Sequence, residues 1–179
     1  CSYGEDKGIF GFGNNSVEGP SGFKSTTNLV SNTGVVSSDV AGVGTGRYGS
    51  SACEYGEDKG IFGFGNISSS PWTLTGVTNL VSNAGVVASD TAAVGTARQS
   101  SAACSYGEDK GIFIFGNDGS YCDITNLVSN AGVVASDVTG VGTARKSPAA
   151  CEYGGDKAIF GYGATGSNVS ITNLVSNAG

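Results

Sequence analysis

Short runs of alternating hydrophobic and polar residues follow one another along the chain, and the same runs return four times. The run "KGIFGFG" at residues 7–13 places Phe10 and Phe12 on one face of an extended strand and Ile9 on the other. Runs such as "TNLV" and "GVVASDV" are rich in β-branched residues and are bounded by Asn and Gly. Because no stretch has helical periodicity, the pattern predicts an all-β protein.

Two kinds of turn separate these runs. "GEDKG" lies between the first two runs of the first three units, and the fourth unit has "GGDKA" there. "SNTG" or "SNAG" lies between the last two runs of the first three units. Both offer glycine for a positive φ and polar side chains that bond locally. We therefore expect four short strands in each unit, with the small-residue run "SAACSYG" as the innermost strand.

The units can be aligned on the hexapeptide "TNLVSN", which is identical at residues 27–32, 78–83, 125–130 and 172–177. One repeat domain thus covers residues 1–179, with units at 1–52, 53–103 and 104–150 and an incomplete unit at 151–179. Four short strands in a unit of about 50 residues are typical of a β-propeller blade. The alternative is a β-solenoid, in which successive units stack.

All the variation in length lies in one interval of the unit, at residues 14–26, 66–77, 117–124 and 164–171. In a four-stranded meander, the loop after the second strand and the connection after the fourth leave the sheet at the same edge. We therefore expect the variable segments to share one rim with the "GT-x-R" connections. Loops tolerate such change more readily than strands do, whether or not they bind anything.

Charge and composition exclude several classes of partner and chemistry. The net charge of −6 argues against nucleic acid and anionic membrane surfaces as partners. Histidine is absent, which excludes Ser-His-Asp triads and imidazole metal sites. Methionine is absent too, so we expect a mature or cut-out piece of a longer translation product.

Cysteine recurs at the start of each unit, as Cys1, Cys53, Cys104 and Cys151, and Cys122 stands apart in a variable segment. Equivalent strands of neighbouring blades lie too far apart for a disulfide, and the C-x2-C spacing of a thiolate metal site is absent. We expect small buried thiols, with no metal and no cofactor. Cys122 is expected either to be free or to pair between molecules.

The repeated carboxylates do not suggest catalysis. The adjacent pair Glu5 and Asp6 returns in two further units, whereas a catalytic pair should be unique and convergent. The sequence therefore predicts structural turns and no enzyme. Asp39, Asp90 and Asp137 recur in "SD" and are expected to bond locally.

The candidate binding residues lie in the variable segments and at the connections. Isolated aromatic residues among small polar ones suit sugar faces or protein grooves, although they can also fold back onto the blade. The arginines of "GT-x-R" are expected to tie blades together and to hold an anionic group. The predicted ligand-binding residues are Phe23, Lys24, Arg47, Trp72, Arg98, Tyr121 and Arg145, and the N-x-S glycosylation candidates are Asn14, Asn66 and Asn168.

The stretch "GTARKSPAACEYGGDKAIFGYG" resembles the kelch-type repeat, with an Arg, a small-residue inner strand, an acidic turn and an apolar strand that ends in glycine. This resemblance implies a β-propeller with kelch-like four-stranded blades. The amino-acid sequence of the repeats also resembles that of repetitive proteins of environmental phages, of the tail-fibre or receptor-binding type. That second resemblance implies an extracellular or virion-surface location.

The expected function is a non-enzymatic binding or adhesion module that recognises a cell-surface glycan or protein through its variable loops. The alternatives are a structural subunit of an extracellular filament and a hydrolase that acts on polysaccharides. No nucleic acid or membrane partner is expected. Self-association, or a longer parent chain, is expected to complete the fourth blade.

Overall fold

The computed structural model describes residues 1–15 and 22–179, and this part of the chain contains strands and no helix. The all-β prediction is confirmed. No helix in the described residues could therefore cross a membrane. The strands are β1 Ser2–Tyr3, β2 Lys7–Asn14, β3 Phe23–Val30, β4 Ser51–Tyr55, β5 Lys59–Ser69, β6 Trp72–Val81, β7 Ala102–Tyr106, β8 Lys110–Asn117, β9 Tyr121–Val128, β10 Ala149–Tyr153, β11 Lys157–Gly161 and β12 Thr172–Val175.

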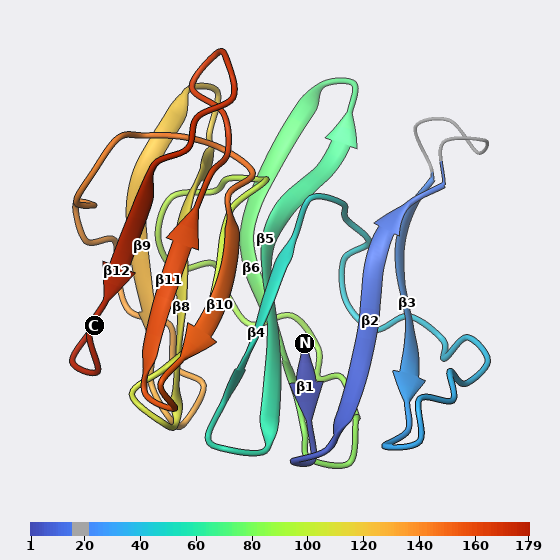
Figure 1. Ribbon diagram of the computed structural model, residues 1–179. Helices are drawn as coiled ribbons and strands as arrows, with labels where there is room; N and C mark the ends of the chain where they lie inside the picture. The colour runs from blue at the N-terminus through green and yellow to red at the C-terminus, as the bar shows by residue number, and fades with distance from the viewer. Residues whose placement is uncertain (16–21) are drawn as a thin grey trace.

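The strands form four antiparallel sheets, one for each repeat, in the orders β1-β2-β3, β4-β5-β6, β7-β8-β9 and β10-β11-β12. Figure 1 shows the sheets standing side by side. This arrangement is consistent with the predicted propeller-like fold, although the described residues form no closed ring. It differs from a solenoid, in which each strand would pair with its counterpart in the next repeat.

Each sheet has three strands, so the prediction of four-stranded blades is wrong. The "GVVASDV" segments make only isolated bridges to the outer strand, such as Val87 with Val81 and Thr91 with Thr78. Between these bridges the side chain of Asn79 donates hydrogen bonds to the carbonyl of Ala88 (3.0 Å) and to Asp90 (2.9 Å). This side-chain bonding takes the place of a continuous backbone ladder.

The two phenylalanines of the second strand face opposite ways, contrary to the prediction for Phe10 and Phe12. The register of β2 shifts between Gly11 and Gly13, and Phe12 there has a φ of 63°. Such a bulge turns the chain and ends the simple alternation of faces. Consequently, in the second repeat Phe62 packs on the preceding sheet and Phe64 on the following one.

The core lies between neighbouring sheets. At each junction the first Phe of one repeat meets the second Phe of the repeat before it, edge to face. These ring pairs are Phe12–Phe62, Phe64–Phe113 and Phe115–Phe160, with centroids 5.1, 5.2 and 6.5 Å apart. Since the pairs repeat, one kind of interface joins all four sheets.

The inner strands add a second contact of the same kind to each junction. Tyr3 and Tyr55 are buried, each against the turn glycine of the following repeat. A Cβ placed on Gly85 would lie 2.9 Å from the ring of Tyr3, and one on Gly132 would lie 2.9 Å from the ring of Tyr55. Both glycines also have a positive φ, so the turn and the close contact each require glycine.

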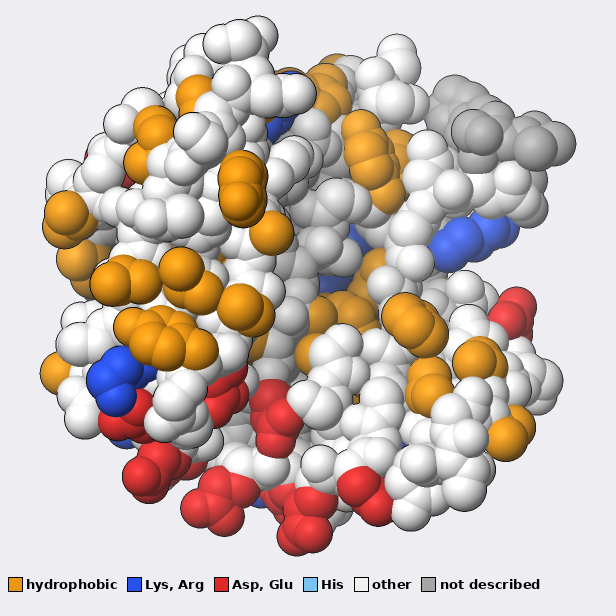
Figure 2. Space-filling view, in the orientation of Figure 1, with side chains coloured by type: hydrophobic (Ala, Val, Ile, Leu, Met, Phe, Trp, Pro, Cys, Tyr) orange, Lys and Arg blue, Asp and Glu red, His pale blue; other side chains and the backbone are white. Residues whose placement is uncertain are grey.

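The "GEDKG" segments form turns, as predicted, and they also link the repeats. The amide of Gly4 donates to the carbonyl of Asp58 in the next repeat (2.6 Å), and that of Gly56 donates to Asp109 (2.7 Å). Figure 2 shows the acidic side chains gathered at the lower edge of the molecule, where Figure 1 places these turns.

Candidate binding rim

The variable segments lie at the edge of the sheets opposite to the acidic turns (Figure 1). We call this edge the variable rim and define it by residues 14–15, 22–26, 66–77, 117–124 and 164–171. The remainder of the first variable segment lies outside the described residues. The "GT-x-R" connections run beside the rim, because the amide of Arg47 donates to the carbonyl of Lys24 and that of Arg145 to Cys122.

Three of the predicted ligand-binding residues hold the same place in successive sheets. Phe23, Trp72 and Tyr121 are the first residues of the third strands β3, β6 and β9. The ring of Phe23 stacks on Tyr48, with centroids 5.5 Å apart. Lys146 Nζ lies 5.8 Å from the centroid of the Tyr121 ring. The rim thus carries one aromatic side chain at the head of each of these three sheets.

Trp72 and Tyr121 expose the most aromatic surface on the rim, at 46% and 36%. β5 and β6, with 11 and 10 residues, are longer than β2, β3, β8 and β9, which have 8 each. A Cβ on Gly119, in the β8–β9 turn, would lie 4.0 Å from Trp72 Cζ3. The structure therefore brings Trp72 to the turn that leads into Tyr121, whereas Phe23 is half-buried against Tyr48 and Lys24 is half-buried beside it.

The arginines lie in the core instead of on the surface of the rim. Arg47, Arg98 and Arg145 are fully buried, and each guanidinium lies over a phenylalanine ring at 3.9, 3.9 and 3.7 Å from its centroid. Burial lowers the pKa of Arg47 and of Arg98 to about 10. This position is contrary to the predicted role in holding an anionic ligand, and it agrees with the predicted role in joining the repeats.

Two of the three arginines join repeats through side-chain hydrogen bonds, whereas the Arg47 side chain donates to the Thr45 carbonyl of its own repeat. Arg98 Nε donates to the carbonyl of Phe115 in the next sheet (2.9 Å), and its Nη1 donates to Thr96 (3.2 Å). Arg145 Nη2 donates to Asn173 Oδ1 of the next sheet (2.8 Å). A planar guanidinium can stack on a ring and bond at its edge at the same time.

A carboxylate makes a further link between repeats that the sequence did not predict. Asp90 was expected to bond only locally, but it accepts from the backbone amide and the hydroxyl of Thr45 in the preceding repeat. Asp137 accepts from Thr96 in the same way. Burial raises the pKa of Asp90, but hydrogen bonds from Thr45 and Asn79 outweigh burial and leave that pKa below its ordinary value.

The three glycosylation candidates differ in accessibility. Asn14 and Asn168 are exposed. Asn66 is completely buried, and its Oδ1 accepts from the amide of Ser68 at 2.9 Å. The prediction is therefore wrong for Asn66, because the strand pairing that extends the β5–β6 hairpin encloses its side chain.

The cysteines are free thiols. Cys53 and Cys104 are buried as expected, whereas Cys1 is half-buried and Cys151 is exposed. Cys122, which was expected to be free or to pair between molecules, is also buried. Burial raises the pKa of Cys53 and of Cys104 to about 12, so these thiols are protonated at neutral pH. The described residues contain no group of three or more Cys, Asp or Glu side chains placed to hold a metal ion.

The carboxylates of the acidic turns are engaged in the turns themselves. Asp58 accepts from Lys59 (2.6 Å) and from Asn83 (3.0 Å), and these bonds lower its pKa. The same arrangement recurs at Asp109, which accepts from Lys110 and Asn130. Such copies are structural in character and do not converge on one cleft.

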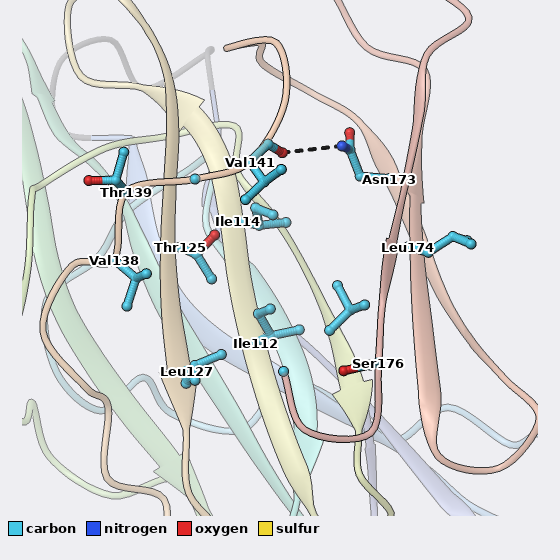
Figure 3. A pocket seen from close by; sticks show the side chains of 13 residues that line it. Ile112, Ile114, Thr125, Leu127, Val138, Thr139, Val141, Asn173, Leu174 and Ser176 are labelled. Carbon is cyan, nitrogen blue, oxygen red and sulfur yellow. Dashed lines mark hydrogen bonds between the residues drawn. The ribbon is translucent and has the colours of Figure 1, made fainter.

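An apolar hollow of about 390 Å³ lies between the third and fourth sheets (Figure 3). Leu127, Val141 and Leu174 are among its lining residues, and Asn173 Nδ2 donates to the Val141 carbonyl across it at 3.2 Å. Leu80 and Val94, the counterparts of Leu127 and Val141 in the second repeat, pack against the buried core cluster that includes Val134. The hollow therefore corresponds to a packing position within the core and is not a built ligand site.

Comparison with known proteins gives a fold likeness alone. The sequence matches no protein-family description and no curated protein. The structure is similar to a solved structure of YjhT, with a TM-score of 0.65 and 15% sequence identity. The match covers 86% of this chain and 50% of that one, so the chain spans about half the length of YjhT.

Proposed function

We propose that this protein is a non-enzymatic binding module that recognises a glycan or a protein surface through the variable rim. One observation carries the proposal. The exposed aromatic side chains of Trp72 and Tyr121 lie at the one edge of the sheets where the repeats differ in both length and sequence.

The chemistry of the rim suits recognition by stacking. Trp and Tyr present large rigid apolar faces with a polar atom at one end, and they contribute heavily to binding energy when a partner covers them. Small polar residues such as Ser70 and Ser120 flank them in the same hairpins and supply hydrogen-bonding groups. Because such loop sites are shallow, the affinity of a single site is expected to be weak and to rise when several sites act together.

In this proposal the sheets are blades of a kelch-like β-propeller, and the module works outside the cell or on a virion, as a tail-fibre or receptor-binding component does. The separate repeated sheets and the fold likeness to YjhT support the blade arrangement. The resemblance of the repeats to those of phage proteins supports the location.

A polysaccharide hydrolase is less well supported. Such an enzyme needs two carboxylates that face each other across a cleft, about 5–10 Å apart. The aspartates of the acidic turns lie at the edge opposite to the variable rim, and each is bonded to its own Lys and Asn. The binding role is therefore favoured over the catalytic one.

A screen against immobilised glycans and cell surfaces tests the proposal. Three changes at the rim are compared with the unaltered chain: Trp72→Ala, Tyr121→Ala, and exchange of residues 66–77 for the shorter segment 117–124. Loss of a stacked aromatic is expected to weaken binding roughly 10- to 100-fold.

The matched control is Glu57→Gly, at an exposed position of the opposite edge with a φ of 67°. The fourth repeat already has Gly155 at that position, so the fold tolerates the change. Binding should be retained in this variant. Binding that survives the rim changes but is lost in Glu57→Gly would place the site on the acidic edge and refute the proposal.

A further inference from the structure

The first and fourth sheets each show a face that is buried wherever two sheets meet inside the chain. Phe10 on the first sheet is 66% exposed, whereas its counterpart Phe62 is 4% exposed. Tyr153 on the fourth sheet is 40% exposed, whereas its counterpart Tyr106 is 2% exposed. The two uncovered faces are therefore the two halves of the interface that already joins the sheets.

The face of the fourth sheet contains a socket for a phenylalanine. At the internal junctions, the ring of Phe62 lies over Gly11, and the ring of Phe113 lies over Gly63. A Cβ on Gly11 would lie 3.1 Å from the Phe62 ring, and one on Gly63 would lie 2.9 Å from the Phe113 ring. On the fourth sheet the corresponding Gly161 meets only Thr172 of its own sheet.

A hollow of about 460 Å³ surrounds this glycine, and its lining includes Cys151, Ile159 and Tyr162. Tyr162 has the same left-handed backbone as Phe12 (φ of 64° and 63°) and is 62% exposed. Tyr162 thus supplies, at the edge of the socket, the aromatic ring that would contact an incoming phenylalanine.

The complementary parts lie on the face of the first sheet. Gly34 has the position and the positive φ of Gly85, which covers Tyr3, but nothing lies within 4 Å of the place of its Cβ. It can therefore cover Tyr153 of another sheet as Gly85 covers Tyr3. Phe10 projects from the same face and can enter the socket.

We propose that two copies of this chain associate head to tail, with the first sheet of one copy on the fourth sheet of the other. A second copy is the occupant because this chain itself carries both halves of the interface, and three internal junctions show that the halves fit. The contact is heterologous, since it joins two different faces. This inference does not depend on the proposed function, because neither face belongs to the variable rim.

An engineered disulfide tests the geometry of the contact. Cys1 Sγ lies 2.9 Å from the place of a Cβ on Gly60, and Cys53 Sγ lies 2.7 Å from that on Gly111. A disulfide places one sulfur about 3 Å from the opposite Cβ, given an S–S bond of about 2 Å. The corresponding pair between two copies is Cys151 and Gly8.

The variant Gly8→Cys, in a Cys1→Ser/Cys122→Ser background, should therefore form a disulfide with Cys151 of a second copy under mild oxidation. A Cβ at Gly8 meets only ordinary contacts, the shortest at 3.5 Å to Val30, so the change fits the sheet. The products are separated without reductant. A product that stops at two copies indicates a closed pair and a ladder indicates an open chain, and both are head-to-tail products.

Two controls make the result decisive. Adding Cys151→Ser to the same variant should abolish the linked product, and equal yield with and without Cys151 would overturn the proposal.

Sedimentation velocity on the unlinked chain supplies an independent readout. Phe10→Ser should weaken association roughly 10- to 100-fold, as expected for one buried aromatic side chain, while Trp72→Ser on the rim should leave it unchanged. A chain that sediments as a monomer at its highest soluble concentration would also overturn the proposal.

Discussion

Replacing Arg98 by Met should destabilise the fold by about 3 kcal/mol, although no exposed surface changes. Met fills a similar volume and keeps the apolar stem, but it removes the guanidinium that bonds to Phe115 and Thr96 and lies over the ring of Phe64. Because Arg98 is completely buried, water cannot replace these interactions in the folded protein.

The magnitude follows from opposing contributions. Each hydrogen bond from a charged donor contributes about 2 kcal/mol, and a desolvated cation–π contact contributes about 2 kcal/mol. Burial of the charge opposes them. It lowers the pKa of Arg98 from 12.5 to about 10, which corresponds to roughly 3 kcal/mol. About 3 kcal/mol of net stabilisation remains.

Arg47 provides the matched comparison within the same chain. It is equally buried and lies at the same 3.9 Å from its ring, but among the residues that the structure describes only its Nη1 has a hydrogen-bond partner, the carbonyl of Thr45. Its Nε has none, whereas Arg98 Nε bonds across to the next sheet. Arg47→Met should therefore cost about 1 kcal/mol, roughly one charged hydrogen bond less than Arg98→Met.

Urea denaturation followed by far-ultraviolet circular dichroism measures both variants against the unaltered chain. The difference between the two variants is the critical quantity, since it cancels most of the uncertainty in the burial contribution. Equal losses of stability would refute the assignment of the extra stabilisation to the bond between Arg98 and Phe115. A loss below about 1 kcal/mol for Arg98→Met would refute the whole account.

Two further predictions concern titrating groups. The first is measured below the concentration at which copies associate, with a thiol reagent at pH 8. The reagent should modify the exposed Cys151 rapidly but reach Cys53 only on unfolding, because Cys53 is buried and burial raises its pKa to about 12. Rapid modification of Cys53 would contradict this packing. For Asp137, burial raises the pKa, but the bonds from Thr96 and Asn126 outweigh it and leave the folded-state pKa below 3.8. The carboxylate therefore adds stability above its ordinary pKa, which is lost as the pH falls through the lower folded-state value. Asp137→Asn should cost about 1 kcal/mol at neutral pH and flatten the acid limb of the stability curve. Asp39→Asn is the control and should cost less stability at neutral pH, because that carboxylate accepts from Asn28 of its own repeat.

The sequence was sufficient to predict the elements that depend on local chemistry. Strand periodicity and turn glycines fixed the all-β class, the "GEDKG" turns and the edge at which the variable segments lie. The faces of Phe10 and Phe12 could not be predicted in this way, because a bulge with a left-handed phenylalanine is set by packing between sheets. Successive side chains of a strand alternate between the two faces of the sheet only where the backbone hydrogen-bond ladder is regular.

The burial of the arginines was missed for a related reason. Arginine is rarely buried without a carboxylate partner, so its recurrence in a connection suggested a surface role. The available signal was the constant spacing between each Arg and the "FG" glycine of the next repeat, which indicates a fixed contact. The prediction of a fourth, outermost strand was wrong because the side chains of Asn28 and its counterparts compete with backbone pairing. Strand propensity scales do not include that competition.

The Phe–Phe junction has a consequence for how such a chain changes over generations. Every repeat presents the same face forward and the same face backward, so a recombination event that duplicates or deletes one whole repeat joins surfaces that already match. Only the number of units changes, and no new interface has to arise by point mutation. The variable hairpins meanwhile diverge independently, because none of them contributes to the junction rings. Lineages carrying this repeat can therefore alter their length and their loops as separate inherited traits.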